Sequence, residues 1–166
     1  MKNEFCLSRI ARSTRICGFF LGMALLLPSV YGKKDAYHFK FGLMTLGGAG
    51  TPVVYLETTE IDKHVDPSYL HGFTIKRKNG AQFFAYFKVR FPEPLKNIPA
   101  AVYEHYTVLE DGRVLQSKEE LVWELVENFV FDKSDPVGPY EMEIYIDGEL
   151  YRTIKYNVSA VPEFGL

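Results

Sequence analysis

The stretch Ala81-Gln82-Phe83-Phe84-Ala85-Tyr86-Phe87-Lys88-Val89-Arg90-Phe91 decides the fold of this chain. Its odd-numbered residues are all apolar, whereas its even-numbered residues include Gln82, Lys88 and Arg90. Side chains point alternately to the two faces of a β-strand, so the pattern predicts a half-buried strand with the odd-numbered set inward. Pro92 and Pro94 end this strand, because proline has no N–H to donate to a sheet.

The same alternation occurs on both sides of Asp147-Gly148, within residues 139–158, and predicts a β-hairpin. A two-residue loop here would turn the two apolar rows to opposite faces, since a shift of one residue reverses every side chain. A three-residue loop, residues 146–148, pairs Ile144 with Leu150 and aligns the rows. We therefore expect the longer loop, with Gly148 in the left-handed conformation that glycine tolerates.

Further strands are predicted by weaker alternation between regularly spaced turn residues. They cover residues 37–46, 53–61, 72–78 and 101–109, with a return strand after Asp111-Gly112. Residues 117–130 fit two structures: their apolar spacing and a possible capping box suit a helix, whereas the preceding turn favours a strand. We expect the strand, and with it an all-β sandwich or barrel.

Residues 1–32 have the pattern of an export signal. Basic residues precede an apolar run at residues 16–27, and the small residue Gly32 stands at the expected cut. The run is shorter than the about 20 apolar residues of a membrane-spanning helix, although an uncleaved anchor is the alternative. We predict a signal-peptide helix at residues 1–32, a single domain at residues 33–166, and a periplasmic or secreted protein without membrane insertion after cleavage.

Charge and cysteine content narrow the function of the exported part. The whole chain has 19 basic and 21 acidic side chains; residues 1–32 hold four of the basic and one of the acidic ones, which leaves a net charge of −5. Without a basic stripe, nucleic acid is a poor partner. Both cysteines, Cys6 and Cys17, lie in the signal, so disulfides, thiolate metal sites and cysteine nucleophiles are excluded after cleavage.

The C-terminal part of the chain resembles a known family. Phe131 to Pro136, the segment from Gly138 to Tyr145, and residues 148–158 resemble the closing hairpin of immunoglobulin-like domains in exported bacterial proteins. With residues 58–61 and 89–92 they are similar to an uncharacterised bacterial family of unknown function, over roughly residues 56–158. The resemblance implies an immunoglobulin-like antiparallel β-sandwich. It implies no activity, because its motifs are turns and core aromatics.

Few residues suggest chemistry. His64, Asp66 and His71 could supply metal ligands, although their spacing matches no established motif. The glycine-rich residues 47–50 lack the Gly-Lys-Ser/Thr of a phosphate loop, and we expect no cofactor. The acidic side chains are expected on solvated faces; they are Glu119, Glu120, Glu124, Glu127, Glu141 and Glu143.

One surface stands out: four aromatic side chains are expected on the outward side of the strands, namely Phe84, Tyr86, Tyr145 and Tyr151. Exposed aromatic patches mark binding surfaces. Our first hypothesis is therefore a non-enzymatic envelope domain that binds an unidentified protein or polymer through this face or through an edge strand. The alternatives are a metal protein or enzyme using the histidine loop, and a structural envelope subunit acting through assembly.

Overall fold

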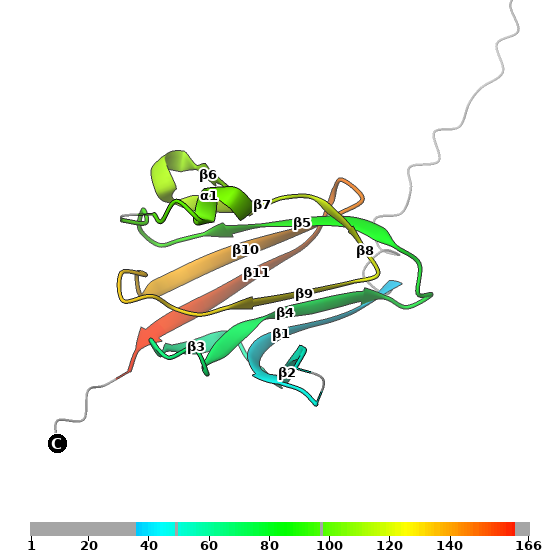
Figure 1. The fold of residues 1–166 in the computed structure, drawn as a ribbon, viewed down its shortest axis with the longest axis horizontal. Coiled ribbons are helices and arrows are strands. Elements are labelled where there is room, and N and C mark those ends of the chain that lie inside the picture. Colours follow the sequence, from blue (N-terminus) through cyan, green and yellow to red (C-terminus); the bar gives the residue numbers. More distant parts are fainter. Residues whose placement is uncertain (1–35, 49, 97, 162–166) are drawn as a thin grey trace, which may run out of the picture.

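The chain folds into two β-sheets packed face to face (Figure 1). The computed structural model describes residues 36–48, 50–96 and 98–161, so the predicted signal at residues 1–32 lies outside the described residues. One sheet has four strands in the order β2 (Pro52–Glu57), β1 (Tyr37–Leu46), β4 (Leu70–Arg77) and β9 (Glu124–Phe129).

The other sheet has seven strands. Its order is β3 (Glu60–Lys63), β11 (Glu149–Ala160), β10 (Gly138–Ile146), β5 (Phe83–Arg90), β7 (Val114–Ser117) and β6 (Tyr106–Leu109), and β8 (Glu120–Val122) also pairs with β5. A short helix, α1 (Val102–His105), precedes β6. Within the described residues, no helix has the length and apolar character that crossing a bilayer requires.

The alternation in residues 81–91 places the core as predicted. Phe83 and Phe87 are each 1 % exposed, and they pack with inward-facing residues of both sheets, among them Phe73, Ile75, Met142 and Ile144. Aromatic rings make many of the contacts between the layers; Phe73 of β4, for example, meets Phe87 of β5 edge to face at 5.5 Å. The all-β sandwich is therefore confirmed.

Strand order and one hydrogen bond identify the type of sandwich. In chain order, β1, β4 and β9 occupy the places of strands A, B and E of an immunoglobulin domain, and β5, β10 and β11 those of C, F and G. At the start of β10, the Tyr140 hydroxyl donates a hydrogen bond of 2.6 Å to the carbonyl of Pro136. This is the tyrosine corner of immunoglobulin folds. The sandwich is immunoglobulin-like, as the resemblance implied.

The loop of the β10–β11 hairpin differs from the prediction. Ile146 pairs with Glu149, so the loop has two residues, Asp147 and Gly148, both with positive φ. The register instead shifts at Tyr151, where Ile144 pairs with Arg152 and Tyr145 with Leu150. A bulge in β11 thus aligns the two apolar rows, which we had attributed to a longer turn.

Three further predicted strands differ from the prediction, and two of them change where the chain changes partner. Predicted strand 53–61 is split at Thr58 and Thr59, because β2 pairs with β1 whereas β3 pairs in parallel with β11 in the other sheet. Residues 101–109 begin with α1 before β6. Residues 117–130 are extended, as expected, but form two strands: β8 pairs with β5 and β9 with β4.

Candidate functional site

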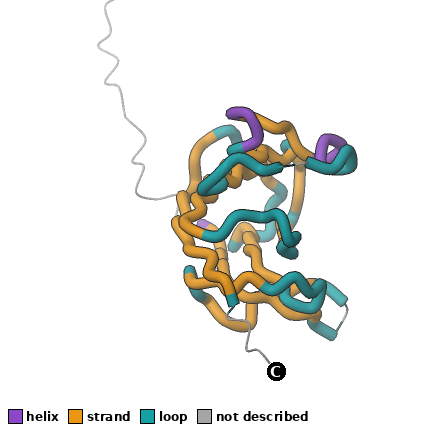
Figure 2. The backbone as a smooth tube through the Cα atoms, turned by 90° about the vertical axis from the view of Figure 1, so that its left-hand side faces the viewer, coloured by secondary structure: helices purple, strands orange, loops and turns teal. Residues whose placement is uncertain are grey.

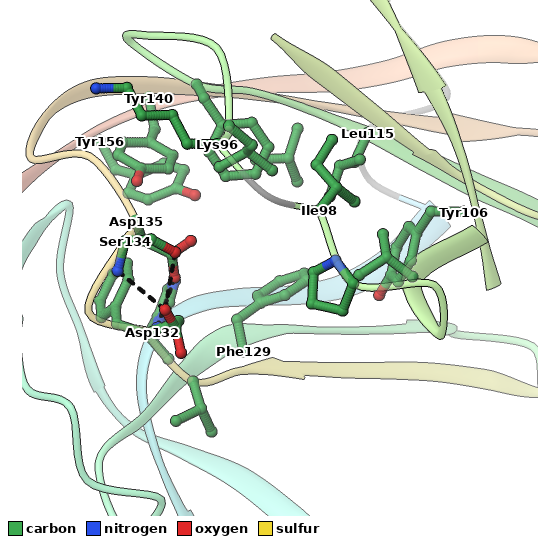
Figure 3. Close-up of a pocket in the computed structure, with 18 residues that line it drawn as sticks. Lys96, Ile98, Tyr106, Leu115, Phe129, Asp132, Ser134, Asp135, Tyr140 and Tyr156 are labelled. Carbon is green, nitrogen blue, oxygen red and sulfur yellow. Dashed lines mark hydrogen bonds between the residues drawn. The ribbon is translucent and has the colours of Figure 1, made fainter. Parts of the chain in front are cut away.

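A cavity of about 330 Å³ lies between the two sheets at one end of the sandwich (Figure 3). Its apolar wall comes from the segment that follows β5, from β7 and from β9; it includes Phe91, Leu95, Ile98, Leu115 and Phe129. Loops and turns gather at this end of the molecule, as Figure 2 shows. We call this space the apolar cavity; its size and lining are those of a small ligand pocket.

His71, on β4, is a wall of the apolar cavity and is 3 % exposed. Its ring stacks on Phe131 with centroids 4.4 Å apart. Within the described residues, its Nδ1 has no hydrogen-bond partner. Burial among apolar groups lowers the pKa of His71 to about 4, and a hydrogen bond with the Phe129 backbone opposes this shift. The imidazole is therefore neutral at physiological pH.

A polar turn lies across the apolar cavity from its apolar wall. Asp132 accepts hydrogen bonds from the N–H and hydroxyl of Ser134, and Asp135 accepts one from the Asp132 N–H (Figure 3). Lys63 donates to the carbonyls of Lys133 and Asp135. Burial raises the pKa of the Asp135 carboxyl above its usual value. The cavity thus combines an apolar interior with hydrogen-bond acceptors on one side.

A second space, the polar cavity, has a volume of about 280 Å³ and shares Tyr106 as a wall with the apolar cavity. It is lined by Ala85, His105, Tyr106, Ser117, Lys118, Glu120, Leu125 and Glu127. Glu127 is half-buried, and burial, followed by repulsion from Glu120, raises its pKa to about 7. The prediction that Glu127 lies on a solvated face is wrong, because odd-numbered residues of β9 point between the sheets.

The predicted aromatic face is present in part. Phe84 is 49 % exposed, and Tyr86 and Tyr145 lie beside each other on the outer face of the seven-stranded sheet, with stacked rings 4.5 Å apart. Tyr151 is 7 % exposed and packs inside against Tyr37 and Phe39, so its outward placement is wrong. The bulge in β11 is the cause, since it turns Tyr151 inward and leaves Leu150 outward.

Two residues outside the prediction extend this face. Leu150 pairs with Tyr145, Leu121 of β8 pairs with Phe84, and both are about half exposed. We call the continuous surface of Leu150, Tyr145, Tyr86, Phe84 and Leu121 the outer aromatic patch. It crosses four neighbouring strands, from β11 to β8.

The predicted metal ligands are divided between two places. His64 stacks on Tyr69 with centroids 4.0 Å apart, and Asp66 accepts hydrogen bonds from the N–H and hydroxyl of Ser68 in the same loop. His71 instead lies in β4 and faces the apolar cavity. Among the residues that the structure describes, no group of three His, Cys, Asp or Glu side chains could hold a metal ion.

Comparison with known families identifies the domain. The family described as "PM0630 beta sandwich domain" matches residues 39–159, which include every strand from β2 to β10 and most of β1 and β11. The chain belongs to the PM0630 beta sandwich domain family. Among solved structures, this PM0630 domain is similar to an immunoglobulin-like protein from Pseudomonas aeruginosa, with 13% identity, a TM-score of 0.45, and coverage of 74% of this chain and 92% of that chain. The comparison with curated proteins gave no match.

Sequence reasoning missed both cavities of this PM0630 domain. The signal for Glu127 was its parity with Leu125 and Phe129, which places a carboxylate in an inward apolar row. The signal for His71 was its parity with Phe73 and Ile75 in β4. The cavity walls from residues 91–96 and 98–102 carry no such signal, because these residues lie outside strands and only Val102 belongs to a helix, α1.

Proposed function

We propose that this chain is a non-enzymatic binding domain of the bacterial envelope, exported to the periplasm or secreted, which recognises a protein partner through the outer aromatic patch. The observation that carries the proposal is the row of apolar side chains left open on a sheet face, with Phe84, Leu121 and Leu150 each about half exposed. Contiguous apolar surface of this kind marks interaction sites in soluble domains.

The orientation of the tyrosines favours a protein over a carbohydrate polymer. Sugar rings bind by lying flat on an open aromatic face. Tyr86 and Tyr145 cover one face of each other, and the Lys88 ammonium lies 4.9 Å from the centroid of the Tyr145 ring. Each stacked ring thus keeps at most one face free, and tyrosine is enriched at protein interfaces.

Charged side chains border one end of the patch, as at the rim of a protein interface. Arg90, Glu141 and Lys155 lie side by side on β5, β10 and β11, where Arg90 pairs with Glu110 and Lys155 with Glu141. The carboxylate of Glu143 accepts a hydrogen bond of 2.8 Å from the Tyr145 hydroxyl. Glu143 lies on the outer face of β10, outside the two cavities described above, and this position supports a binding role over acid–base catalysis.

The experiment is affinity capture from an envelope extract of the source bacterium with three forms of the protein: the unchanged chain, Phe84→Asp, and Tyr55→Asp as control. Tyr55 is 62 % exposed on β2 of the other sheet. We expect a polypeptide that the unchanged chain and the control retain and that Phe84→Asp retains at least about tenfold less, since a charge in the patch would have to be buried. Equal retention by all three forms, or enrichment of glycan alone, would overturn the proposal.

A further inference from the structure

The edge strand β9 offers a second binding surface, independent of the outer aromatic patch. Among the described residues, β9 pairs only with β4 and ends the four-stranded sheet. In an immunoglobulin constant-type sheet, strand D pairs with strand E, whose place β9 occupies here. After β5, this chain instead sends β6, β7 and β8 to the seven-stranded sheet, so the strand D position carries no strand in the described part of the chain.

Both cavities lie beside this vacant position. The polar cavity is lined by Leu125 and Glu127 of β9, and the apolar cavity by Phe129 of the same strand. Opposite them stand residues of β6 and β7 near the far edge of the other sheet, with Tyr106 common to both cavities. The two cavities are therefore neighbours along the side where both sheets end.

The spacing of the cavities equals the repeat of a β-strand. Glu127 and Phe129 are two residues apart and point to the same side, and inward side chains of any strand recur at this interval of about 7 Å. A strand added alongside β9 would place one inward side chain at Glu127 and the next at Phe129.

Charge determines which side chain suits the polar cavity. Within the described residues Glu127 forms no salt bridge, although Glu120 faces the same cavity and repels its carboxylate. Lys118 and His105 also line this space, but neither lies within salt-bridge distance of Glu127. An incoming ammonium or guanidinium would compensate the two carboxylates, and in this half-buried position the pairing is stronger than on the open surface.

We propose that β9 binds an extended peptide of a partner protein by antiparallel strand addition at the vacant strand D position, with an apolar side chain in the apolar cavity and a lysine or arginine in the polar cavity. Strand D runs antiparallel to its neighbour in the immunoglobulin sheet. In that direction the residue opposite Phe129 precedes the one opposite Glu127. The recognised sequence is therefore apolar, any residue, basic.

The test uses a fluorescent nine-residue peptide of Thr and Ser that carries Leu and, two positions later, Arg; its binding to the full chain is followed by anisotropy. We expect saturable binding. Replacement of the peptide's Arg by Glu should weaken binding at least about tenfold, because the carboxylate would face Glu127 and Glu120. A peptide with the order of Leu and Arg reversed should bind about tenfold more weakly, since its side chains would meet the wrong cavities.

Variants of the protein separate this site from non-specific charge attraction. Glu127→Gln should remove the preference for Arg over an uncharged Gln in the peptide. Glu124→Gln should keep it, because Glu124 is on the same strand but points outward and pairs with Lys76 at 3.5 Å. Equal binding of the Arg and Glu peptides, an unchanged preference in Glu127→Gln, or equal binding of the reversed peptide would overturn the proposal. Phe84→Asp should bind the peptide normally, so the outcome is independent of the outer aromatic patch.

Discussion

His71 and Glu127 are two polar side chains that point between the sheets. Their pKa values are shifted in opposite directions from the ordinary values of histidine and glutamate. Burial lowers the pKa of His71 to about 4 and raises that of Glu127 to about 7. In each case burial disfavours the charged form of the side chain. The stability of the domain must therefore depend on pH at both residues, with opposite signs.

The unfolded chain binds a proton at His71 below pH 6.5, whereas the folded chain does so only near pH 4. Stability due to this residue is therefore complete above pH 6.5 and is lost as pH falls toward 4. We expect a loss of about 2–3 kcal/mol over this window. Urea unfolding of His71→Phe should lack this loss, whereas His38→Asn, a change at an exposed histidine of β1, should retain it. An identical acid limb in His71→Phe would contradict the assignment.

Glu127 acts in the other direction. Its folded-state pKa lies above the value of 4.5 for an unperturbed glutamate, so the folded state becomes less stable as pH rises from about 4.5 to 7. The carboxyl is only half-buried, and water screens part of the effect; we expect Glu127→Gln to gain on the order of 1 kcal/mol at pH 8 relative to pH 5. The measurement is urea unfolding at both pH values. A gain of the same size in Glu124→Gln would show that the effect is general charge and not Glu127.

At the scale of elements, two glycines face each other across β1 and β4. Gly42 pairs with Gly72, and both have φ values near +155° that other residues rarely adopt. A Cβ on Gly72 would overlap the backbone oxygen of Glu127, and one on Gly42 the backbone oxygen of Leu56. The close approach of β9 and β2 to these central strands thus requires glycine at both positions.

Gly72→Ala should therefore cost more than about 3 kcal/mol of unfolding free energy, because backbone strain and a clash with backbone act together. Gly80→Ala is the matched control: Gly80 also has positive φ, but nothing lies within 4 Å of the added methyl group. This control should cost about 1–2 kcal/mol. Chemical denaturation measures the unfolding free energy of both variants. Equal losses would contradict the claim that close contact with β9 requires glycine at position 72.

The elements that sequence predicted well are those with a strict period of two. The alternation in residues 81–91 correctly predicted which side chains of β5 point inward, because Phe83, Phe87 and Val89 all lie on the one face that packs against the core. The turn of the β10–β11 hairpin was predicted wrongly because a bulge at Tyr151 and a longer loop restore register equally well. Alternation shows that register is restored but not where, and Tyr151 was misplaced for the same reason.

At the scale of the whole molecule, sequence predicted the sandwich and three residues of the outer aromatic patch but neither cavity. The patch follows from the parity of single strands, which a sequence displays directly. The cavities depend on how residues 91–96, 98–102 and 130–135 lie across the end of the sandwich, and on the absence of a strand beside β9 among the described residues. These are long-range features, and local periodicity carries no information about them.

The proposed export concerns the whole chain, and it predicts a defined product. If residues 1–32 are a cleaved signal, protein recovered from the periplasm or medium should begin at Lys33. Intact-mass spectrometry of the purified protein measures this. Replacing Leu25 and Leu26 by Asp and Arg should interrupt the apolar run and leave the full-length chain in the cytoplasm. Full-length protein in the membrane fraction of the unchanged form would contradict cleavage.

The backbone passes from one sheet to the other between β2 and β3 and again between β8 and β9. The first connection has two residues and the second has one, so strands close together in sequence hydrogen-bond to opposite sheets. Connections this short restrict the movement of the two sheets away from each other. A ligand that binds between the sheets must therefore fit a space of nearly constant width. We also expect the two sheets to unfold together in a single transition.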